Sequence, residues 1–305
     1  MIWEKKGLIF DPKGKLDWAT DSALQPTPVV LEDRIRIFCG CRDAEGISRI
    51  GWVDVDTEHP ETVLGYSQVP ALDIGLPGCF DDNGVVPTAV VQREGKLFLY
   101  YAGYQLVKNV RFIAFTGLAV SDDHGISFKR FKNTPVLERS TEEFLFRAIH
   151  TIFYDEGKWK VWYGAGSSFI DGSNKSLPVY NIRYMESADG ITFPDKGSVV
   201  LNTALQEHRV GRPYVIKSDN KYLMFFGAST DSQAYRLAYA ESADGINWQR
   251  KDQDLGIGYK EGEFDSDMSA YPALVMIRDR MYLFYNGNEY GKEGFGLALL
   301  TKNIL

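Results

Sequence analysis

The sequence predicts an all-β protein in which one domain, residues 1–305, folds as a five-bladed β-propeller. The first observation is a repeated phrase: YMESADGITF at 184–193 returns as YAESADGINW at 239–248, with a looser copy, LAVSDDHGISF, at 118–128. Each copy joins an alternating apolar run to an Ile-x-aromatic stretch through a turn that ends in glycine. This pattern is typical of two strands linked by a tight turn.

The second observation is a spacing of 14 residues, or 15 in one unit, that recurs five times between the first residue of an apolar strand and the end of the next strand. It links Pro26 to Gly40, Pro87 to Ala102, His150 to Gly164, Pro213 to Gly227 and Pro272 to Asn286. The second strands read RIRIFCG, KLFLYYA, KWKVWYG, KYLMFFG and RMYLFYN, which are rich in β-branched and aromatic residues. Repeated four-stranded units around an axis form a propeller. A two-sheet sandwich is the alternative, and the matching spacings argue against it.

The two ends of the chain predict how the ring closes. The last unit stops after its third strand, GFGLALL, and lacks an outer strand. WEKKGLIF at 3–10 resembles the outer strands FKRFKNTPVL at 128–137 and WQRKDQDLGI at 248–257. We therefore expect the N-terminal strand to complete the last blade.

Composition excludes several classes of function. A net charge of −7 and a pI near 5.3 argue against a nucleic acid partner, since phosphate backbones bind clusters of Lys and Arg. Cys39, Cys41 and Cys79 lack the spacing of a disulfide framework or zinc site, so we expect reduced thiols and no metal ligands. The N-terminus carries charge within four residues and no long apolar run, which predicts a cytoplasmic protein without a membrane span. No cofactor is expected to be required, although a structural ion would fit the central channel.

The candidate catalytic residues are carboxylates that precede the inner strands, because those loops meet at one mouth of the channel. Asp21, Asp82 and Asp267 each lie five residues before a strand-leading proline, and Glu143 precedes the third inner strand. Crowding separates the pKa values of neighbouring carboxyl groups. Glycoside hydrolysis uses such a pair, about 5–5.5 Å apart in retaining and roughly 6.5–9.5 Å apart in inverting enzymes. The pattern therefore predicts carboxylate acid/base chemistry on a glycoside.

Other polar and aromatic residues beside these loops are candidates for substrate binding. They are Asp81, Arg147, His150, Glu207, Arg209, Arg212, Asp265 and Tyr271. The candidate aromatic platforms for a sugar are Phe80, Tyr104, Phe169, Tyr271 and Tyr290. Each has an alternative: Asp beside Gly or Ser often caps a turn, Arg212 could hold neighbouring blades together, and His150 could be a core histidine.

The chain as a whole resembles the glycosidase propellers of the arabinanase, xylosidase, invertase and mannoside phosphorylase superfamily. The stretches FDDNGVVPT, RPYV, FDSDMSAYP and YNGN are similar to uncharacterised glycosidase-like proteins often associated with bacterial polysaccharide gene clusters. The resemblance implies a carbohydrate substrate. Arabinanase-like and invertase-like enzymes place Asp directly before the first-blade proline and Glu two residues before its third-blade equivalent, where this chain has Gln25 and Ala148.

Three functions remain open at this point. The leading hypothesis is a glycoside hydrolase acting on an oligosaccharide at the channel mouth. The alternatives are a carbohydrate-binding propeller without catalysis, which Gln25 and Ala148 favour, and a glycoside phosphorylase, whose phosphate could be bound by Arg147, Arg209, Arg212 and His150. A protein-interaction propeller would need large exposed apolar patches and has little support. The sequence says nothing about oligomeric state.

Overall fold

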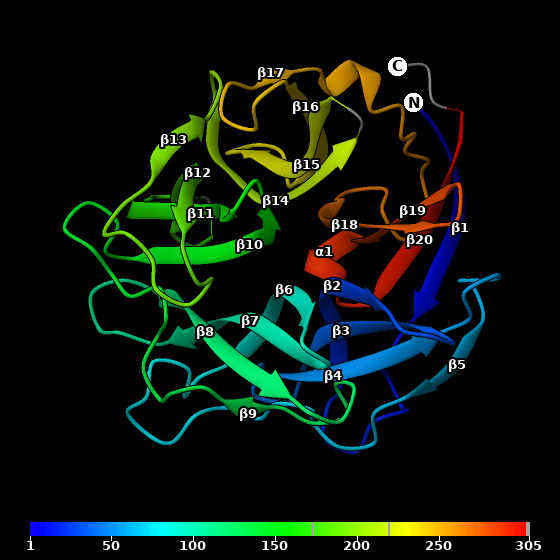
Figure 1. Ribbon diagram of the computed structural model, residues 1–305, viewed down its shortest axis with the longest axis horizontal. Helices are drawn as coiled ribbons and strands as arrows, with labels where there is room; N and C mark the ends of the chain where they lie inside the picture. The colour runs from blue at the N-terminus through cyan, green and yellow to red at the C-terminus, as the bar shows by residue number, and fades with distance from the viewer. Residues whose placement is uncertain (173, 219, 303–305) are drawn as a thin grey trace.

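The computed structural model describes residues 1–172, 174–218 and 220–302, which form an all-β, propeller-type fold with almost no helix (Figure 1). Within these ranges the strands pair into five antiparallel groups of four. The first group is β2 (Asp21–Val30), β3 (Ile35–Arg42), β4 (Ser48–Val55) and β5 (Val63–Tyr66). The second is β6 (Val85–Arg93), β7 (Lys96–Gln105), β8 (Ile113–Ser121) and β9 (Lys129–Arg130). The all-β prediction is confirmed.

The remaining groups follow the same order from the centre outward. The third is β10 (Phe146–Asp155), β11 (Lys158–Ile170), β12 (Leu177–Ser187) and β13 (Ser198–Leu201). The fourth is β14 (Glu207–Ser218), β15 (Lys221–Thr230), β16 (Arg236–Ser242) and β17 (Gln249–Arg250). The fifth is β18 (Ala270–Ile277), β19 (Arg280–Asn286), β20 (Phe295–Lys302) and β1 (Ile2–Phe10). Short parallel contacts of β8 with β10 and of β12 with β14 join the middle three groups into one twelve-stranded sheet.

The N-terminal strand lies where the sequence predicts it. β1 pairs antiparallel with β20, with Trp3 opposite Leu300 and Leu8 opposite Gly296. The indole of Trp3 is buried and donates to the carbonyl oxygen of Leu255 at 2.8 Å. The first segment of the chain thus forms the outer edge of its last sheet (Figure 1).

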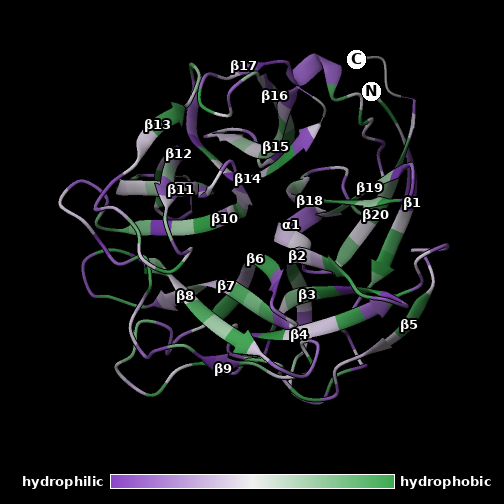
Figure 2. Ribbon diagram, viewed as in Figure 1, coloured by the Kyte–Doolittle hydropathy of each residue, from purple (hydrophilic) through white to green (hydrophobic). Residues whose placement is uncertain are grey.

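Hydrophobic clusters lie between successive groups and hold them around a common centre. One cluster packs Phe38 and Ile50 of the first group against Leu97 and Leu99 of the second. The cluster that contains Ile35, Ile37, Phe284 and Leu297 joins the first group to the fifth. Figure 2 shows the corresponding pattern, with hydrophobic strands and hydrophilic connections. Hydrophobic packing therefore continues across the junction of the first and fifth strand groups, which we call the seam.

A buried asparagine adds hydrogen bonds at the same seam. The side-chain oxygen of Asn286, at the end of β19, accepts a hydrogen bond from the backbone amide of Gln25 at 2.7 Å. Its amide nitrogen donates to the carbonyl oxygens of Ala23 and Gly294 at 2.8 Å each. Asn286 ends the second strand of its unit at the position where Gly40, Gly164 and Gly227 lie in three other units. The unit that has asparagine in place of glycine is therefore the one at the seam.

The repeated phrase forms the turns that the sequence predicts. In both close copies the aspartate accepts from backbone amides, Asp189 from Ile191 and Thr192, and Asp244 from Ile246 and Asn247. These bonds lower the pKa of Asp189 to about 2. Gly190 has φ of 75°, a value that favours glycine. Both aspartates are turn residues.

Helices are short in the described part of the chain. A 3-10 helix covers Asp252–Asp254 and α1 covers Asn288–Gly291. None of the helices seen in residues 1–172, 174–218 and 220–302 has the length and apolar character needed to cross a membrane.

We expect Asn286→Ala to lower the free energy of unfolding by about 2–4 kcal/mol, because it leaves the buried Gln25 amide and two carbonyl oxygens without a partner. The measurement is urea unfolding followed by tryptophan fluorescence. The matched control is Asn202→Ala, at an exposed position, which should change stability by less than about 0.5 kcal/mol. Equal loss in both variants would contradict a role for Asn286 at the seam.

Candidate functional site: a basic, tyrosine-lined central cavity

A bulge in each inner strand directs side chains toward the centre. The pairing of the first and second strands shifts register between Leu24 and Thr27, and at the equivalent place in the other four groups. Gln25, Arg212 and Tyr271 lie at these bulges, each directly before a proline, with φ of 54°, 55° and 57°. A non-glycine residue in this region costs of order 1–3 kcal/mol, and such strain often occurs at functional sites.

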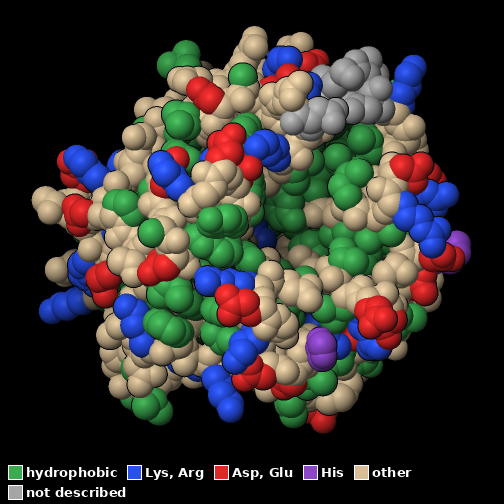
Figure 3. All heavy atoms as spheres, in the orientation of Figure 1, with side chains coloured by type: hydrophobic (Ala, Val, Ile, Leu, Met, Phe, Trp, Pro, Cys, Tyr) green, Lys and Arg blue, Asp and Glu red, His purple; other side chains and the backbone are tan. Residues whose placement is uncertain are grey.

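The central cavity has a volume of 470 Å³ and opens on the face shown in Figure 3, where basic side chains are visible inside the hollow. Its polar wall within the described residues consists of Gln25, Arg42, Ser48, Asn83, Tyr104, Arg111, His150, Lys175, Tyr180, Arg209, Arg212, Tyr235, Tyr271 and Tyr290. No Asp or Glu of the described chain lines it. The cavity is therefore basic and rich in phenols, inside a protein with a net charge of −7.

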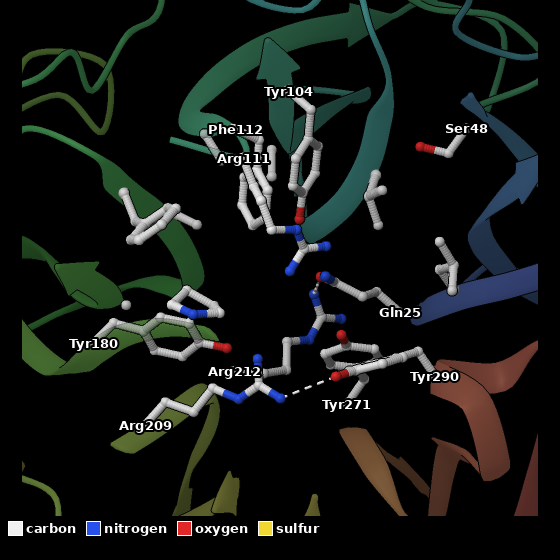
Figure 4. A pocket seen from close by; sticks show the side chains of 18 of the residues that line it. Gln25, Ser48, Tyr104, Arg111, Phe112, Tyr180, Arg209, Arg212, Tyr271 and Tyr290 are labelled. Carbon is white, nitrogen blue, oxygen red and sulfur yellow. Dashed lines mark hydrogen bonds between the residues drawn. The ribbon is translucent and has the colours of Figure 1, made fainter. Parts of the chain in front are cut away.

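Arg212, on β14, reaches across the centre (Figure 4). Its guanidinium donates to Gln25 Oε1 at 2.7 Å, Thr27 Oγ1 at 3.0 Å and the carbonyl oxygens of Pro26 and Pro87 at 3.2 and 3.1 Å. Burial lowers the pKa of Arg212 to about 10, so the group stays charged at neutral pH. It ties three strand groups together.

Arg209 lies on the same strand and is only 6% exposed. One amino group donates to the hydroxyl of Tyr290 at 3.0 Å (Figure 4). The guanidinium carbon lies 4.3 Å from the centre of the Tyr235 ring. Tyr180 packs on Gly211, where a Cβ would come 2.5 Å from its ring, so glycine is required between the two arginines. The hydroxyls of Tyr180 and Tyr235 contact each other.

Three phenols of the wall and its histidine are neutral at physiological pH. Burial raises the pKa of Tyr104 to about 12 and the pKa values of Tyr235 and Tyr271 well above their usual value. Burial and the charge of Arg212 hold the pKa of His150 well below its usual value. These tyrosines are hydrogen-bond donors, and a phenol held protonated is a poor nucleophile.

Three predicted site carboxylates, Asp81, Glu143 and Asp265, are fully buried outside the cavity wall and share one arrangement. Each accepts from a tyrosine of the second strand 20 residues later: Tyr101 at 3.0 Å, Tyr163 at 2.8 Å and Tyr285 at 2.9 Å. Each also pairs with a cation of its own group: Arg130 at 2.8 Å, Arg147 at 2.6 Å and Lys5 at 2.7 Å. We call this arrangement the carboxylate clamp.

In the clamp, the side chains of Asp81, Glu143, Arg147 and Asp265 contact groups of their own strand group, and none of them lines the cavity. Glu143 is bound on both oxygens, since its second oxygen pairs with Arg183 at 2.9 Å. The predicted catalytic and binding roles of these residues stay predictions. The duller alternative, in which such residues satisfy local structure, describes their contacts here.

The other predicted carboxylates also lie outside the cavity wall. Asp21 accepts from Ser22 Oγ at 2.6 Å, and Asp82 accepts from the Gly78 amide at 2.8 Å. Asp267 is exposed, and Glu207 forms a two-bond ion pair with Arg250 at 2.9 Å each. The structure does not gather these four side chains with Glu143 around the cavity, and their catalytic and binding roles stay predictions.

Four predicted binding residues do line the cavity: His150, Arg209, Arg212 and Tyr271. Of the aromatic platforms, Tyr104, Tyr271 and Tyr290 are in the wall, whereas Phe80 packs on Tyr101 and Phe169 packs on Phe112 and Phe146. Sequence reasoning missed Arg42, Arg111, Lys175, Tyr180 and Tyr235. Arg111, Lys175 and Tyr235 lie in the connections after the second strands, whereas Arg42 ends β3 and Tyr180 lies in β12. The sequence signal was therefore only partial, as polar residues in those connections.

No metal centre is built from the side chains that the structure describes, since they contain no group of three or more His, Cys, Asp or Glu residues arranged to hold an ion. The arrangement can donate hydrogen bonds, stack against a ring and attract negative charge. It does not place a general acid beside a general base.

The fold and its central cavity define a class, the propeller-type glycosidase-like proteins. Residues 72–187 match the Glycosyl hydrolases family 32 N-terminal domain. The chain is 33% identical over 302 residues to the uncharacterized protein Rv1502 of Mycobacterium tuberculosis, an alignment that covers 98% of this chain and 99% of the relative. The chain therefore belongs to the same family as Rv1502.

Solved structures agree with this assignment at the level of the fold. The chain is similar to a structure described as a glycoside hydrolase, with a TM-score of 0.74 and 16% identity over 99% of this chain and 93% of that one. It is also similar to the endo-arabinase from Bacteroides thetaiotaomicron, with a TM-score of 0.65 and 13% identity over 94% and 99% of the two chains.

We expect Glu143→Gln to lower the free energy of unfolding by about 3–5 kcal/mol, because it leaves the buried Arg147 and the half-buried Arg183 without a counter-charge. Its neighbour Glu142 is exposed and its side chain pairs with Lys196 at the surface, so Glu142→Gln should change stability much less. Urea unfolding of both variants makes the comparison. A stable Glu143→Gln protein would contradict the clamp.

His150 should make the protein less stable in mild acid. The unfolded imidazole titrates at about 6.5, whereas the folded one has a much lower pKa, so between the two values the unfolded state binds the extra proton. The free energy of unfolding therefore falls as pH drops below about 6.5, by at most about 1.4 kcal/mol per pH unit from this residue.

The check is the urea midpoint across about pH 5 to 8 for wild type, His150→Gln and the exposed control His59→Gln. His150→Gln should flatten the acid side of the profile, while His59→Gln should leave it unchanged. The pKa of His208 is also lowered by burial, so part of the slope should remain in both variants. Parallel profiles for wild type and His150→Gln would contradict the prediction.

Proposed function

We propose that this protein binds a carbohydrate in its central cavity and does not cleave it by paired carboxylates. The observation that carries the proposal is the absence of Asp and Glu from the cavity wall in the described residues. Gln25 and Ala148 border the cavity where the resemblance to arabinanase-like and invertase-like enzymes leads one to expect Asp and Glu. Hydrolysis in most glycoside hydrolase families needs two carboxyl groups that flank the scissile bond.

The cavity has the size and lining that a small glycan requires. Its 470 Å³ falls in the range of about 300–1,000 Å³ that is usual for small-molecule sites. Tyr104, Tyr271 and Tyr290 offer aromatic faces for the C–H edges of a sugar, and Ser48, Asn83 and Gln25 offer polar partners for hydroxyl groups. We take the five strand groups as five blades around this site, which accounts for its position at their common centre (Figure 1).

Glycoside hydrolysis is the second candidate, and the similarity to glycoside hydrolases favours it. In that case Asp82 and Asp267 would supply the acid and base, with Asp21 completing the set, from positions outside the cavity wall. Phosphorolysis is its variant, in which the basic wall would hold phosphate as the nucleophile. Both require product formation, which separates them from binding alone.

The test is a panel of neutral and acidic oligosaccharides, with and without phosphate, in which binding is measured by calorimetry and products by mass spectrometry. We expect at least one glycan to bind without cleavage, and Tyr104→Ala to weaken that binding about tenfold through loss of about 1.4 kcal/mol of contact energy. A shortened glycan released by wild type would contradict the proposal.

If cleavage occurs, Asp82→Asn distinguishes the second candidate. Loss of turnover by orders of magnitude would make Asp82 a catalytic residue, provided that the exposed control Asp122→Asn keeps full activity. Retention of activity in Asp82→Asn would remove that residue from the mechanism.

A further inference from the structure

The cavity wall concentrates positive charge that has no counter-charge nearby. Among the described residues, Arg42, Arg111, Lys175, Arg209 and Arg212 line it, and none of the five forms an ion pair within 4.0 Å. Buried basic residues elsewhere are paired: Arg36 with Asp54, Arg147 with Glu143 and Lys160 with Asp155. In the described part of the chain, the buried basic side chains without an ion pair, Arg209 and Arg212, thus both lie in the cavity.

Arg212 and Arg209 differ in how many donors they leave free. The two amino groups of Arg212 donate to Gln25, Thr27 and two carbonyl oxygens, and only its buried Nε has no partner among the described residues. In the part of the chain that the structure describes, the side chain of Arg209 donates only to Tyr290, and its buried Nε has no partner. A buried cation without an anionic partner is costly, so Arg209 is poised to accept one.

The groups around Arg209 would complete a site for an oxyanion. Tyr290 lies between two cations, because it accepts from Arg209 and its ring centre is 5.8 Å from Lys175 Nζ. Tyr235 and Tyr271, with pKa values raised by burial, keep their hydroxyl protons and can donate. Tyr271 and Tyr290 also hold left-handed backbone conformations, with φ of 57° and 63°. Arg209, Tyr290 and Tyr271 point into the same space in Figure 4.

We propose that Arg209, Tyr290 and Lys175 form a subsite for an oxyanion, a carboxylate or a phosphate, within the central cavity. This inference rests on the proposed carbohydrate site and specifies its ligand as an acidic or phosphorylated sugar. Guanidinium groups bind both oxyanions through charge-assisted hydrogen bonds. The enclosed positive field selects such a ligand over a neutral sugar of the same size.

The experiment measures binding of four probes to the full chain by calorimetry: glucose, glucuronic acid, glucose 6-phosphate and inorganic phosphate. We expect one of the charged sugars to bind at least tenfold more tightly than glucose, and added salt to weaken that binding selectively, because the cavity is open to solvent ions. Binding of inorganic phosphate with equal strength would identify free phosphate, instead of a substituent on the sugar, as the source of the oxyanion.

Arg209→Met should remove the preference for charged probes, and Tyr290→Phe and Lys175→Met should reduce it. Lys175 is exposed, so its variant keeps the test valid if Arg209→Met does not fold. The matched control is Arg139→Met, which removes an exposed arginine outside the cavity and should leave binding unchanged.

Failure of the inference differs from failure of the proposed function. If charged and neutral probes bind wild type equally, or if Lys175→Met and Tyr290→Phe retain the full preference, the oxyanion subsite is wrong while carbohydrate binding stands. If no probe and no glycan of the panel binds, both are wrong.

Discussion

The guanidinium of Arg212 at the centre of the molecule is the interaction on which the arrangement of the inner strands depends. It donates to groups of the first and second strand groups from a strand of the fourth, and so spans the channel. A buried cation is costly unless it is hydrogen-bonded, and side-chain and carbonyl oxygens at the bulges accept from both amino groups of Arg212. The bulges, the residues before the prolines and Arg212 therefore stabilise one another. Because no carboxylate neutralises Arg212 among the residues described, the base of the cavity keeps a positive charge.

The acidic residues of the loops serve the strand groups and not the cavity. In the clamp each carboxylate joins the loop before an inner strand to a tyrosine of the second strand and to a basic residue of the same group. Such a buried pair is hard to break once formed, because removal of one partner leaves the other charged and desolvated. The carboxylates of the clamp thus lie in the interior of the strand groups, whereas the basic and phenolic side chains of the cavity wall are arginine, lysine and tyrosine.

This division explains how a protein with a net charge of −7 can present a basic central site. Most of its acidic residues are paired or exposed, whereas Arg209 and Arg212 of the cavity are buried, where electrostatic attraction is screened less than at the surface. A fold shared with glycoside hydrolases does not by itself fix the chemistry of the site. In this chain the composition of the wall argues for recognition of a glycan, with charge as the selective feature.

The sequence by itself determined the strand groups, the turn role of Asp189 and Asp244, the pairing of the N-terminal strand with the last group, and the replacement of two expected carboxylates by Gln25 and Ala148. These follow from local periodicity and turn chemistry, which act over a few residues. Only the tertiary structure decided that Asp81 is enclosed while Asp82 is half-buried, because Tyr101 and Arg130, the partners of Asp81, come from later strands. It alone also brought Arg111 and Lys175 into the same cavity as Arg209, because these residues come from different strand groups and meet only when the groups pack around a common centre.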